Sequence, residues 1–298
     1  MKIKKAKKAT VEIDAIARKT QQLFLNEEAE AALTLLDSAL VKYDHVRLWR
    51  LKARILVFFE REAEATDILR RVVPASWYPG FWELVQSGLG LSNVIVSDTH
   101  KLAYFPVPKC GSTSIHNVFG AFSARLPQGE DVRNETFPYQ LINRLGQDGL
   151  PVDFKKILLV RPPLERIRSY YDGNIMKRGH LVRDTGGKNA HYGLKTKPDY
   201  GEFIDNFHAY RRTFLSVRNH TDPLVGFAGN DPSLFDWIGE VRETGDLISY
   251  LSDVTGMTLP NLHDMRSTES SQFTAPSNAE RALLAFYADD IEAYERWF

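Results

Sequence analysis

The sequence predicts an α/β protein in which a parallel sheet flanked by helices follows a small all-α region. Two observations predict the sheet: the apolar runs at 104–107 and 157–160 are each followed by a cationic residue and then by apolar residues at helical spacing. A third predicts the all-α region, because alanine and leucine recur every three or four residues through 10–73. Strands that alternate with helices in this way are typical of parallel α/β sheets.

The chain has 298 residues and a mass of 34.0 kDa, which allows one large or two modest domains. We expect a helical region at 1–77 and a larger α/β domain at 78–298. The boundary falls in 74-PASWYPG-80, where two prolines and a glycine interrupt the helical period.

Composition excludes several classes of protein. The chain has 38 lysine and arginine residues and 38 aspartate and glutamate residues, so its formal net charge is zero. It therefore has no overall positive charge that would attract nucleic acid, and any anion-binding site must be local. The single cysteine, Cys110, excludes an internal disulfide and suits a reducing compartment. The basic start at 1–10 lacks the apolar run of a secretory signal, and runs such as 55–59 are far shorter than the ~18 residues that span a bilayer. We therefore expect a cytoplasmic protein without a membrane span.

The segment 104-YFPVPKCGSTSIHNVFG-120 predicts a phosphate site where a strand turns into a helix. Gly111 lets the backbone approach an anion that a side chain would block, and Lys109 adds a mobile positive charge. Hydroxyl side chains, free backbone N–H groups and the positive end of the helix dipole then meet at one point. The hydroxyl residues are Ser112, Thr113 and Ser114. The alternative is an ordinary strand-to-helix turn with a capping serine.

The order of these residues distinguishes two kinds of phosphate loop. The loop of nucleotide hydrolases places its lysine after the glycines and a hydroxyl on magnesium, whereas here the lysine comes first, in P-K-C-G-S-T-S. This order resembles the 5′-phosphosulfate loop of sulfotransferases, which bind 3′-phosphoadenosine 5′-phosphosulfate (PAPS).

A second segment, 155-KKILLVRPPLERIRSYYDGN-174, supports the same resemblance. An apolar strand of the kind that is buried on both faces ends at Arg161, and Pro163 stands near the start of the next helix. The pattern V-R-x-P-x-x-R-x-x-S-x-Y resembles the 3′-phosphate motif of the same enzymes, with Arg161 and Ser169 at the matching positions. A planar guanidinium suits a terminal phosphate. A kinase or hydrolase would more often have a magnesium-binding aspartate at this strand end.

The chain therefore resembles the PAPS-dependent carbohydrate sulfotransferases (sulfotransferase family 2) over residues 94–298. The resemblance implies a P-loop-like sheet, metal-independent in-line transfer from PAPS to a hydroxyl of a carbohydrate or glycolipid-like acceptor, and PAP as the product. Lys109 would stabilise the leaving phosphate. Cys110 to Ser114 would hold the 5′-phosphate, and Arg161 with Ser169 would hold the 3′-phosphate. Many animal relatives are membrane-anchored Golgi proteins, so a chain without an anchor is expected to be bacterial.

Weaker likenesses follow along the chain. The segment 219–229 contains a His-x-x-Pro sequence like that of the family, 236–256 resembles the strand and helix behind its active site, and 278–298 resembles its C-terminal Tyr-x-x-Asp helix. The family usually has a glutamate where Arg242 stands. The polar segment 172–198, rich in lysine and arginine, is either a solvated loop or a lid for an anionic or sugar acceptor.

Three residues are candidates for the general base that accepts the proton of the acceptor hydroxyl. Glu135 lies in the polar loop between the two motifs, in which one short helical piece is expected near 139–145. His220 belongs to the His-x-x-Pro segment, and His116 is closest in sequence to the donor loop. Glu135 ranks first, because ligands of parallel α/β sheets lie beyond the carboxyl ends of the strands. The loop after the first phosphate-binding helix can bring the Glu135 carboxylate to this edge of the sheet. Each could instead be a surface or packing residue.

The helical region at 1–77 resembles tetratricopeptide hairpins, with fewer than the three repeats that usually stand alone. We expect it to dock on the catalytic domain, on a protein partner or on a second copy of the chain, and a plain helical cap is the alternative. Two other functions stay open: a P-loop kinase or nucleotide hydrolase, which would need ATP and magnesium, and a non-enzymatic helical-repeat adaptor with a degenerate nucleotide fold. The sequence contains no HExxH or paired-cysteine metal motif.

Overall fold

A computed structural model of the chain describes residues 2–72, 94–97, 99–112, 115, 118–119, 140–142, 153–259 and 277–298. The chain divides into two compact units. One comprises Met1–Gly90 and Tyr171–Asn219, and the other comprises Leu91–Tyr170 and His220–Phe298. The boundary that the sequence predicts at residue 77 lies outside the described residues.

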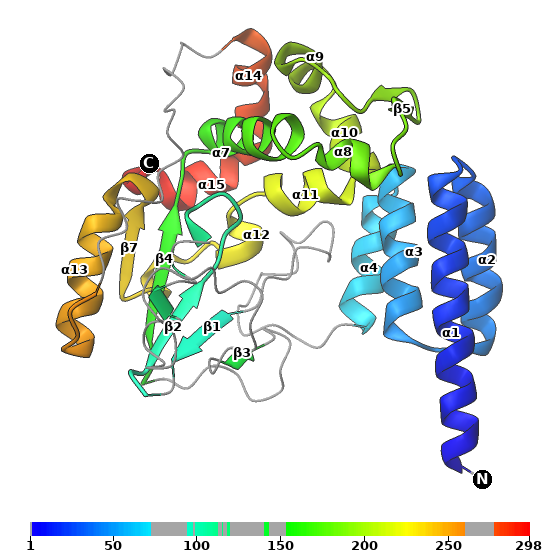
Figure 1. Ribbon diagram of the computed structural model, residues 1–298, viewed down its shortest axis with the longest axis horizontal. Helices are drawn as coiled ribbons and strands as arrows, with labels where there is room; N and C mark the ends of the chain where they lie inside the picture. The colour runs from blue at the N-terminus through cyan, green and yellow to red at the C-terminus, as the bar shows by residue number, and fades with distance from the viewer. Residues whose placement is uncertain are drawn as a thin grey trace. The chain divides into compact units, whose positions relative to one another are not determined.

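The first unit begins with four helices, each of which packs against the next (Figure 1). They are α1 (Lys2–Leu25), α2 (Ala29–Lys42), α3 (Val46–Phe58) and α4 (Glu62–Val72). Their shared core contains small and branched apolar side chains that recur at helical spacing, because such residues line up along one face of a helix. Fully buried members are Ala32, Leu36, Leu48, Ala53 and Leu56. The likeness of this region to tetratricopeptide hairpins stays a prediction.

Helices α1 and α3 end in the same way. Glu27 and Glu60 have φ angles of 67° and 61°, in the left-handed region that closes a helix. Beyond them, the N–H of Glu28 donates to the carbonyl of Leu23, and the N–H of Arg61 donates to the carbonyl of Leu56, each at 2.9 Å. The two glutamates therefore occupy equivalent positions at the ends of two helices.

The remainder of the first unit contains short elements. They are the π-helix η2 (Tyr171–Met176), α8 (His180–Asp184), β5 (Ala190–His191), β6 (Leu194–Lys195), α9 (Tyr200–Asp205), α10 (Phe207–Thr213) and α11 (Leu215–Thr221), whose last two residues belong to the second unit. Strands β5 and β6 form a hairpin whose two turn residues, Tyr192 and Gly193, have φ angles of 46° and 76°. Positive φ at both turn residues matches the twist of a tight hairpin. The polar segment 172–198 thus carries regular structure.

The second unit contains a five-stranded sheet in the order β3-β1-β2-β4-β7 (Figure 1). Its strands are β1 (Val94–Ser97), β2 (Leu102–Phe105), β3 (Gln140–Ile142), β4 (Lys155–Val160) and β7 (Trp237–Glu240). The predicted parallel sheet is confirmed for β2, β4 and β7, whereas β1 pairs antiparallel with both β2 and β3. The helical piece predicted near 139–145 is wrong, because residues 140–142 pair with β1 as a strand. Seven residues are too few for helical spacing to outweigh the backbone hydrogen bonds that a neighbouring strand offers.

The centre of this sheet is apolar, as the sequence predicts. Every residue of β2 is buried, and so are the last four residues of β4, Ile157 to Val160. Strand β4 leads into α7 (Pro163–Tyr170), with Pro163 at the first helical position, where its missing N–H costs nothing. The other elements are α12 (Val225–Ala228), η3 (Pro232–Leu234), η4 (Val241–Glu243), α13 (Thr244–Thr255), α14 (Asn278–Leu283), η6 (Leu284–Tyr287), α15 (Ala288–Tyr294) and η7 (Glu295–Trp297). The predicted C-terminal helix is therefore a chain of short helical pieces.

Candidate active site

The candidate site lies at the carboxyl ends of the three parallel strands of the second unit. Phe105 at the end of β2 is in register with Leu158, and Val160 at the end of β4 is in register with Glu240 at the end of β7. Because parallel strands end at one edge of a sheet, the segments that follow them are brought together there. The predicted donor loop and Arg161 are therefore neighbours in the fold.

The loop after β2 bends at two left-handed residues, Lys109 and Gly111, which both have a φ of 71°. A β-carbon on Gly111 would lie 3.1 Å from Val241 Cγ2 and 3.5 Å from Leu159 Cδ1. Glycine is therefore favoured both by the backbone conformation and by the close packing of the loop on the ends of β4 and β7. Lys109 adopts the same conformation with a side chain, which costs on the order of 1 kcal/mol and is common at ligand sites.

A helix begins at the end of this loop. Ser112 is helical and half-buried, and the N–H of Ile115 donates to the carbonyl of Gly111 at 3.2 Å. The strand-to-helix turn that the sequence predicts is therefore present at the glycine. Four other predicted site residues lie outside the described residues: Thr113, Ser114, His116 and Glu135.

Cys110 is fully buried between these loop residues. Burial raises the pKa of the Cys110 thiol to about 11, and the positive charges of Arg166 and Arg161 lower it by less. The thiol is therefore neutral near pH 7, and the reactive thiolate form is rare. This favours a small packing side chain at this position over a nucleophile or a redox centre.

Arg161 follows β4 directly and is half-buried. Its Nε is buried without a hydrogen-bond partner among the described residues, and none of their carboxylates forms an ion pair with it. A buried donor that lacks an acceptor is costly, so this position favours a bound anion. The side-chain hydroxyl of Ser169, half-buried in the second turn of α7, likewise makes no hydrogen bond to another described residue.

A set of charges at the same edge was not foreseen from the sequence. Arg242 Nε donates to Glu240 Oε2, and Arg242 Nη2 lies 3.5 Å from Glu165 Oε1 in the first turn of α7. The hydrogen bond to Glu240 raises the pKa of Arg242. Arg242 is the position where the sequence departs from the family pattern, and it links the end of β7 to the start of α7. The one sign of this set of charges in the sequence is the carboxylate of Glu240 at the end of β7.

His220 is the one candidate base within the described residues. Its ring stacks on that of Tyr170, with centroids 4.9 Å apart and an angle of 26° between the planes. Tyr170 is the last residue of α7 and follows Ser169 directly. The structure therefore brings His220 to the helix that carries the predicted 3′-phosphate serine.

The segment that follows His220 is held by one face of the C-terminal helices. Tyr287, Asp290 and Tyr294 are spaced so that they share this face. The two tyrosine hydroxyls donate to backbone carbonyls, and the Asp290 carboxylate accepts from two backbone N–H groups. The partners are the carbonyls of Thr221 (2.6 Å) and Gly229 (2.8 Å) and the N–H groups of Leu224 (2.7 Å) and Val225 (2.9 Å). We call residues 221–229 with these three side chains the C-terminal clamp.

A buried arginine completes the clamp. Arg166 of α7 is fully buried and donates to the carbonyl of Asp222. Its charge also acts on the buried carboxylate of Asp290. Burial raises the pKa of Asp290 to about 6, while attraction to Arg166 and the two backbone hydrogen bonds lower it by less. Helices α7 and α15 are thereby coupled through charges that water does not screen.

Among the described residues, no group of three or more histidine, cysteine, aspartate or glutamate side chains is arranged to hold a metal ion. None of the described helices is long and apolar enough to cross a membrane.

A model of the sulfotransferase family matches residues 92–295, which is more than half of the chain. The chain belongs to the sulfotransferase family. The match includes both predicted phosphate motifs, the C-terminal clamp and most of the C-terminal helices. The candidate site therefore lies within the residues that match the family model. Membership supports a transferase with sulfotransferase activity. Neither the curated proteins nor the solved structures gave a match to this chain.

Proposed function

We propose that the protein transfers a sulfuryl group from PAPS to a hydroxyl of a carbohydrate or glycoconjugate, in line and without a metal ion. One observation carries this proposal: a glycine-bent loop with Lys109 and a half-buried Arg161 without a described partner follow neighbouring parallel strands. A donor with two separate phosphate groups needs two such anion sites. Family membership supports the group that is transferred.

For the 5′ end of the donor, we assign binding to the loop and the helix start. Gly111 lets the backbone N–H groups come close to the phosphate, and Ser112 opens the helix whose positive end faces it. Thr113 and Ser114 complete this assignment from the sequence. For the 3′-phosphate, we assign Arg161 and Ser169, whose side-chain donors have no partner among the described residues.

In the transfer step, the acceptor oxygen forms a bond to sulfur while the bond between sulfur and the 5′-phosphate oxygen breaks. Negative charge grows on that phosphate oxygen, which leaves as part of PAP. We assign Lys109 to this charge, because stabilisation that strengthens towards the transition state raises the rate. The sulfuryl group carries less charge than a phosphoryl group, so protein donors can replace the magnesium ion of kinases.

The proton of the acceptor hydroxyl passes to a general base, which we assign to one of Glu135, His220 and His116. The support for His220 is its stacked position beside α7 and the C-terminal clamp that fixes the segment behind it. A base held by packing keeps its orientation without a cost at the moment of reaction. The direct comparison is turnover against pH for Glu135→Gln, His220→Ala and His116→Ala at saturating PAPS.

The experiment that tests the proposed function measures PAP release from PAPS with a set of neutral and acidic oligosaccharides, and sulfated products by mass spectrometry. We expect acceptor-dependent PAP release that is unchanged by a metal chelator. Lys109→Ala is the matched control, since it should bind PAP but turn over slowly. Transfer that required magnesium, or a chain that hydrolysed ATP and ignored PAPS, would contradict the proposal.

A further inference from the structure

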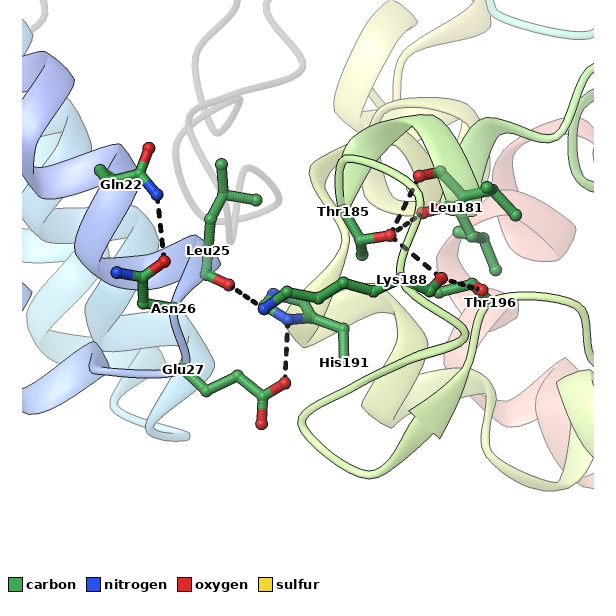
Figure 2. A network of polar contacts seen from close by, with 10 residues as sticks. Gln22, Leu25, Asn26, Glu27, Leu181, Thr185, Lys188, His191 and Thr196 are labelled. Carbon is green, nitrogen blue, oxygen red and sulfur yellow. Dashed lines mark hydrogen bonds and ion pairs between the residues drawn. The ribbon is translucent and has the colours of Figure 1, made fainter.

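Figure 2 shows how buried polar side chains find partners in the first unit. The hydroxyl of the buried Thr196 donates to the carbonyl of Lys188 at 2.6 Å. Lys188 Nζ in turn donates to the carbonyl of Leu25, the last residue of α1, also at 2.6 Å, and so joins the N-terminal helices to the segment that follows α7. Because most buried polar atoms in folded proteins are paired in this way, a buried polar atom without a partner calls for a ligand or a water molecule.

Two charged side chains of the second unit carry such atoms at the ends of adjacent strands. Arg161 Nε and Glu240 Oε1 are buried, and neither has a hydrogen-bond partner among the described residues. Arg161 directly follows Val160, which is in register with Glu240 across β4 and β7. The two side chains have opposite charges and yet form no ion pair with each other. One unpaired donor and one unpaired acceptor are therefore held at neighbouring strand ends.

The donor loop lies beside both groups. The pKa of the Cys110 thiol, which burial raises, is also lowered by the charge of Arg161 and raised by the charge of Glu240. Both charges are therefore within electrostatic reach of one buried atom of the loop. Val241, the residue after Glu240, packs against the loop as well, since its Cγ2 would lie 3.1 Å from a β-carbon on Gly111. The unpaired atoms thus belong to the donor site and not to a remote part of the sheet.

The carboxylate of Glu240 is fixed in one orientation. Glu240 is 6% exposed, and its Oε2 accepts a hydrogen bond from Arg242 Nε. The same carboxylate accepts from the backbone N–H of Glu243, and the Glu243 side chain accepts from the N–H of Glu240 at 3.1 Å. These contacts leave Oε1 as a preorganised acceptor. A carboxylate offers acceptors only, so the group that completes this site must be a donor such as a hydroxyl.

We propose that Glu240 Oε1 accepts a hydrogen bond from the ribose 2′-hydroxyl of the sulfuryl donor, so that the site selects a ribonucleotide over its 2′-deoxy counterpart. The proposal rests on the proposed function, in which Arg161 holds the 3′-phosphate. The 2′-hydroxyl is on the carbon next to the one that bears this phosphate. A nucleotide on Arg161 therefore brings one acceptor and one donor to neighbouring strand ends. In dinucleotide-binding folds, an acidic side chain binds a ribose hydroxyl in the same way.

Arg242 makes such a carboxylate compatible with a phosphate beside it. A carboxylate that carries its full charge would repel the 3′-phosphate in a partly buried site. The contact of Arg242 Nε with Glu240 offsets this charge, while Arg242 Nη2 lies 3.5 Å from Glu165 Oε1. The family usually has a glutamate where Arg242 stands, and a glutamate could not take this role. Arg242 is therefore a positioning residue for Glu240.

The test is calorimetric titration of the full-length protein with PAP and with 2′-deoxyadenosine 3′,5′-bisphosphate, which we call deoxy-PAP. We expect the wild type to bind PAP about tenfold more tightly, because deoxy-PAP leaves the buried Oε1 of Glu240 without its donor. Equal affinities for the two ligands would overturn the proposal and assign Oε1 to a water molecule.

The role of Glu240 is tested by the ratio of the two affinities in variants. Glu240→Met keeps the length of the side chain without an acceptor oxygen, and the ratio should fall from about tenfold to about one. Glu240→Gln, which carries less risk to folding, should give a ratio of about threefold, because a neutral acceptor forms a weaker hydrogen bond. The matched control is Asp253→Asn, which neutralises an exposed carboxylate of α13 and should keep the wild-type ratio. A wild-type ratio in both Glu240 variants would remove Glu240 from the ribose.

The positioning role of Arg242 has its own readout. Arg242→Gln should weaken PAP and deoxy-PAP several-fold, because the charge of Glu240 is no longer offset. Adding Glu240→Gln to Arg242→Gln should restore part of the lost affinity, since the repelling charge is then gone. Losses that simply add in the double variant would overturn this role.

Failure of this inference is distinguishable from failure of the proposed function. A wild type that binds PAP and deoxy-PAP equally keeps the sulfuryl donor and rejects the ribose contact. A wild type that binds neither ligand contradicts the proposed function and the inference with it. A Glu240→Met variant that keeps the wild-type affinity ratio but loses turnover would assign Glu240 to the acceptor and would overturn the inference.

Discussion

The replacement Asp290→Asn should change how the stability of the protein depends on pH. Asp290 is fully buried, accepts the N–H groups of Leu224 and Val225, and is attracted by the buried charge of Arg166. Burial is the largest influence and raises its pKa from 3.8 to about 6. Asparagine keeps the size of the side chain and one acceptor oxygen but cannot take up a proton in this range.

The sign of the effect follows from the direction of this shift. Between about pH 4 and about pH 6 the folded protein holds a proton on Asp290 that the unfolded chain has released. The stabilisation from this group is therefore complete below the unfolded pKa and is lost as the pH rises through about 6. One pKa unit corresponds to about 1.4 kcal/mol, so lowering the pH from about 7 to about 5 should stabilise the wild type by about 1 kcal/mol relative to Asp290→Asn.

Urea unfolding followed by tryptophan fluorescence at the two pH values gives the free energy of unfolding of both proteins. The exposed neighbour Glu292 supplies the matched control, Glu292→Gln, which should follow the wild type at both pH values. A free-energy difference between wild type and Asp290→Asn that stays constant, or that moves in the opposite direction, would refute the reasoning. It would mean that Arg166 and the two N–H groups outweigh burial and keep the carboxylate charged.

The remaining predictions concern the donor site. Arg161→Ala should weaken PAP binding by on the order of 2 kcal/mol through the loss of a charge-assisted contact, and unchanged affinity by calorimetry would remove Arg161 from the 3′-phosphate. Lys109→Ala should lower turnover by roughly a hundredfold at saturating PAPS, and an unaltered rate would exclude its role at the leaving phosphate. Cys110→Ser should stay active, since burial keeps the thiol neutral with a pKa of about 11; loss of turnover with intact PAP binding would reopen a chemical role. Gly111→Ala should cost donor affinity, because the added carbon lies 3.1 Å from Val241 Cγ2; thermal shift with PAP measures it, and a wild-type shift would contradict the close packing.

The sequence predicted those features that depend on neighbouring residues. The continuous apolar run at 157–160 predicted a strand buried on both faces, and these four residues of β4 are buried. The glycine in the donor loop and the proline after Arg161 predicted where the two helices begin, because these residues act on their own backbone. Since the strands are parallel, their ends had to meet, and the register of β2 with β4 confirms it.

Features that depend on distant residues could not be predicted. The Tyr-x-x-Asp spacing at Tyr287 and Asp290 was visible, but its partners around residue 224 are fixed only when the chain folds. The link from Arg242 to Glu240 and Glu165 is equally non-local, as is the contact of the N-terminal helices with the segment that follows α7. The sequence predicts a helical piece near 139–145 and not the strand at 140–142, because the pairing of this strand with β1 has no signal in a short sequence window.

The central claim is that one site binds both phosphate groups of PAP through organic donors alone. The most direct test is calorimetric titration of the full-length protein with PAP, with ATP, and with ATP plus magnesium, each in the presence and absence of a chelator. We expect PAP to bind with a single site, unaffected by the chelator, and to bind more tightly than ATP in either condition. Tight binding of ATP that required magnesium, together with weak or absent binding of PAP, would contradict the claim and indicate a nucleotide kinase or hydrolase instead.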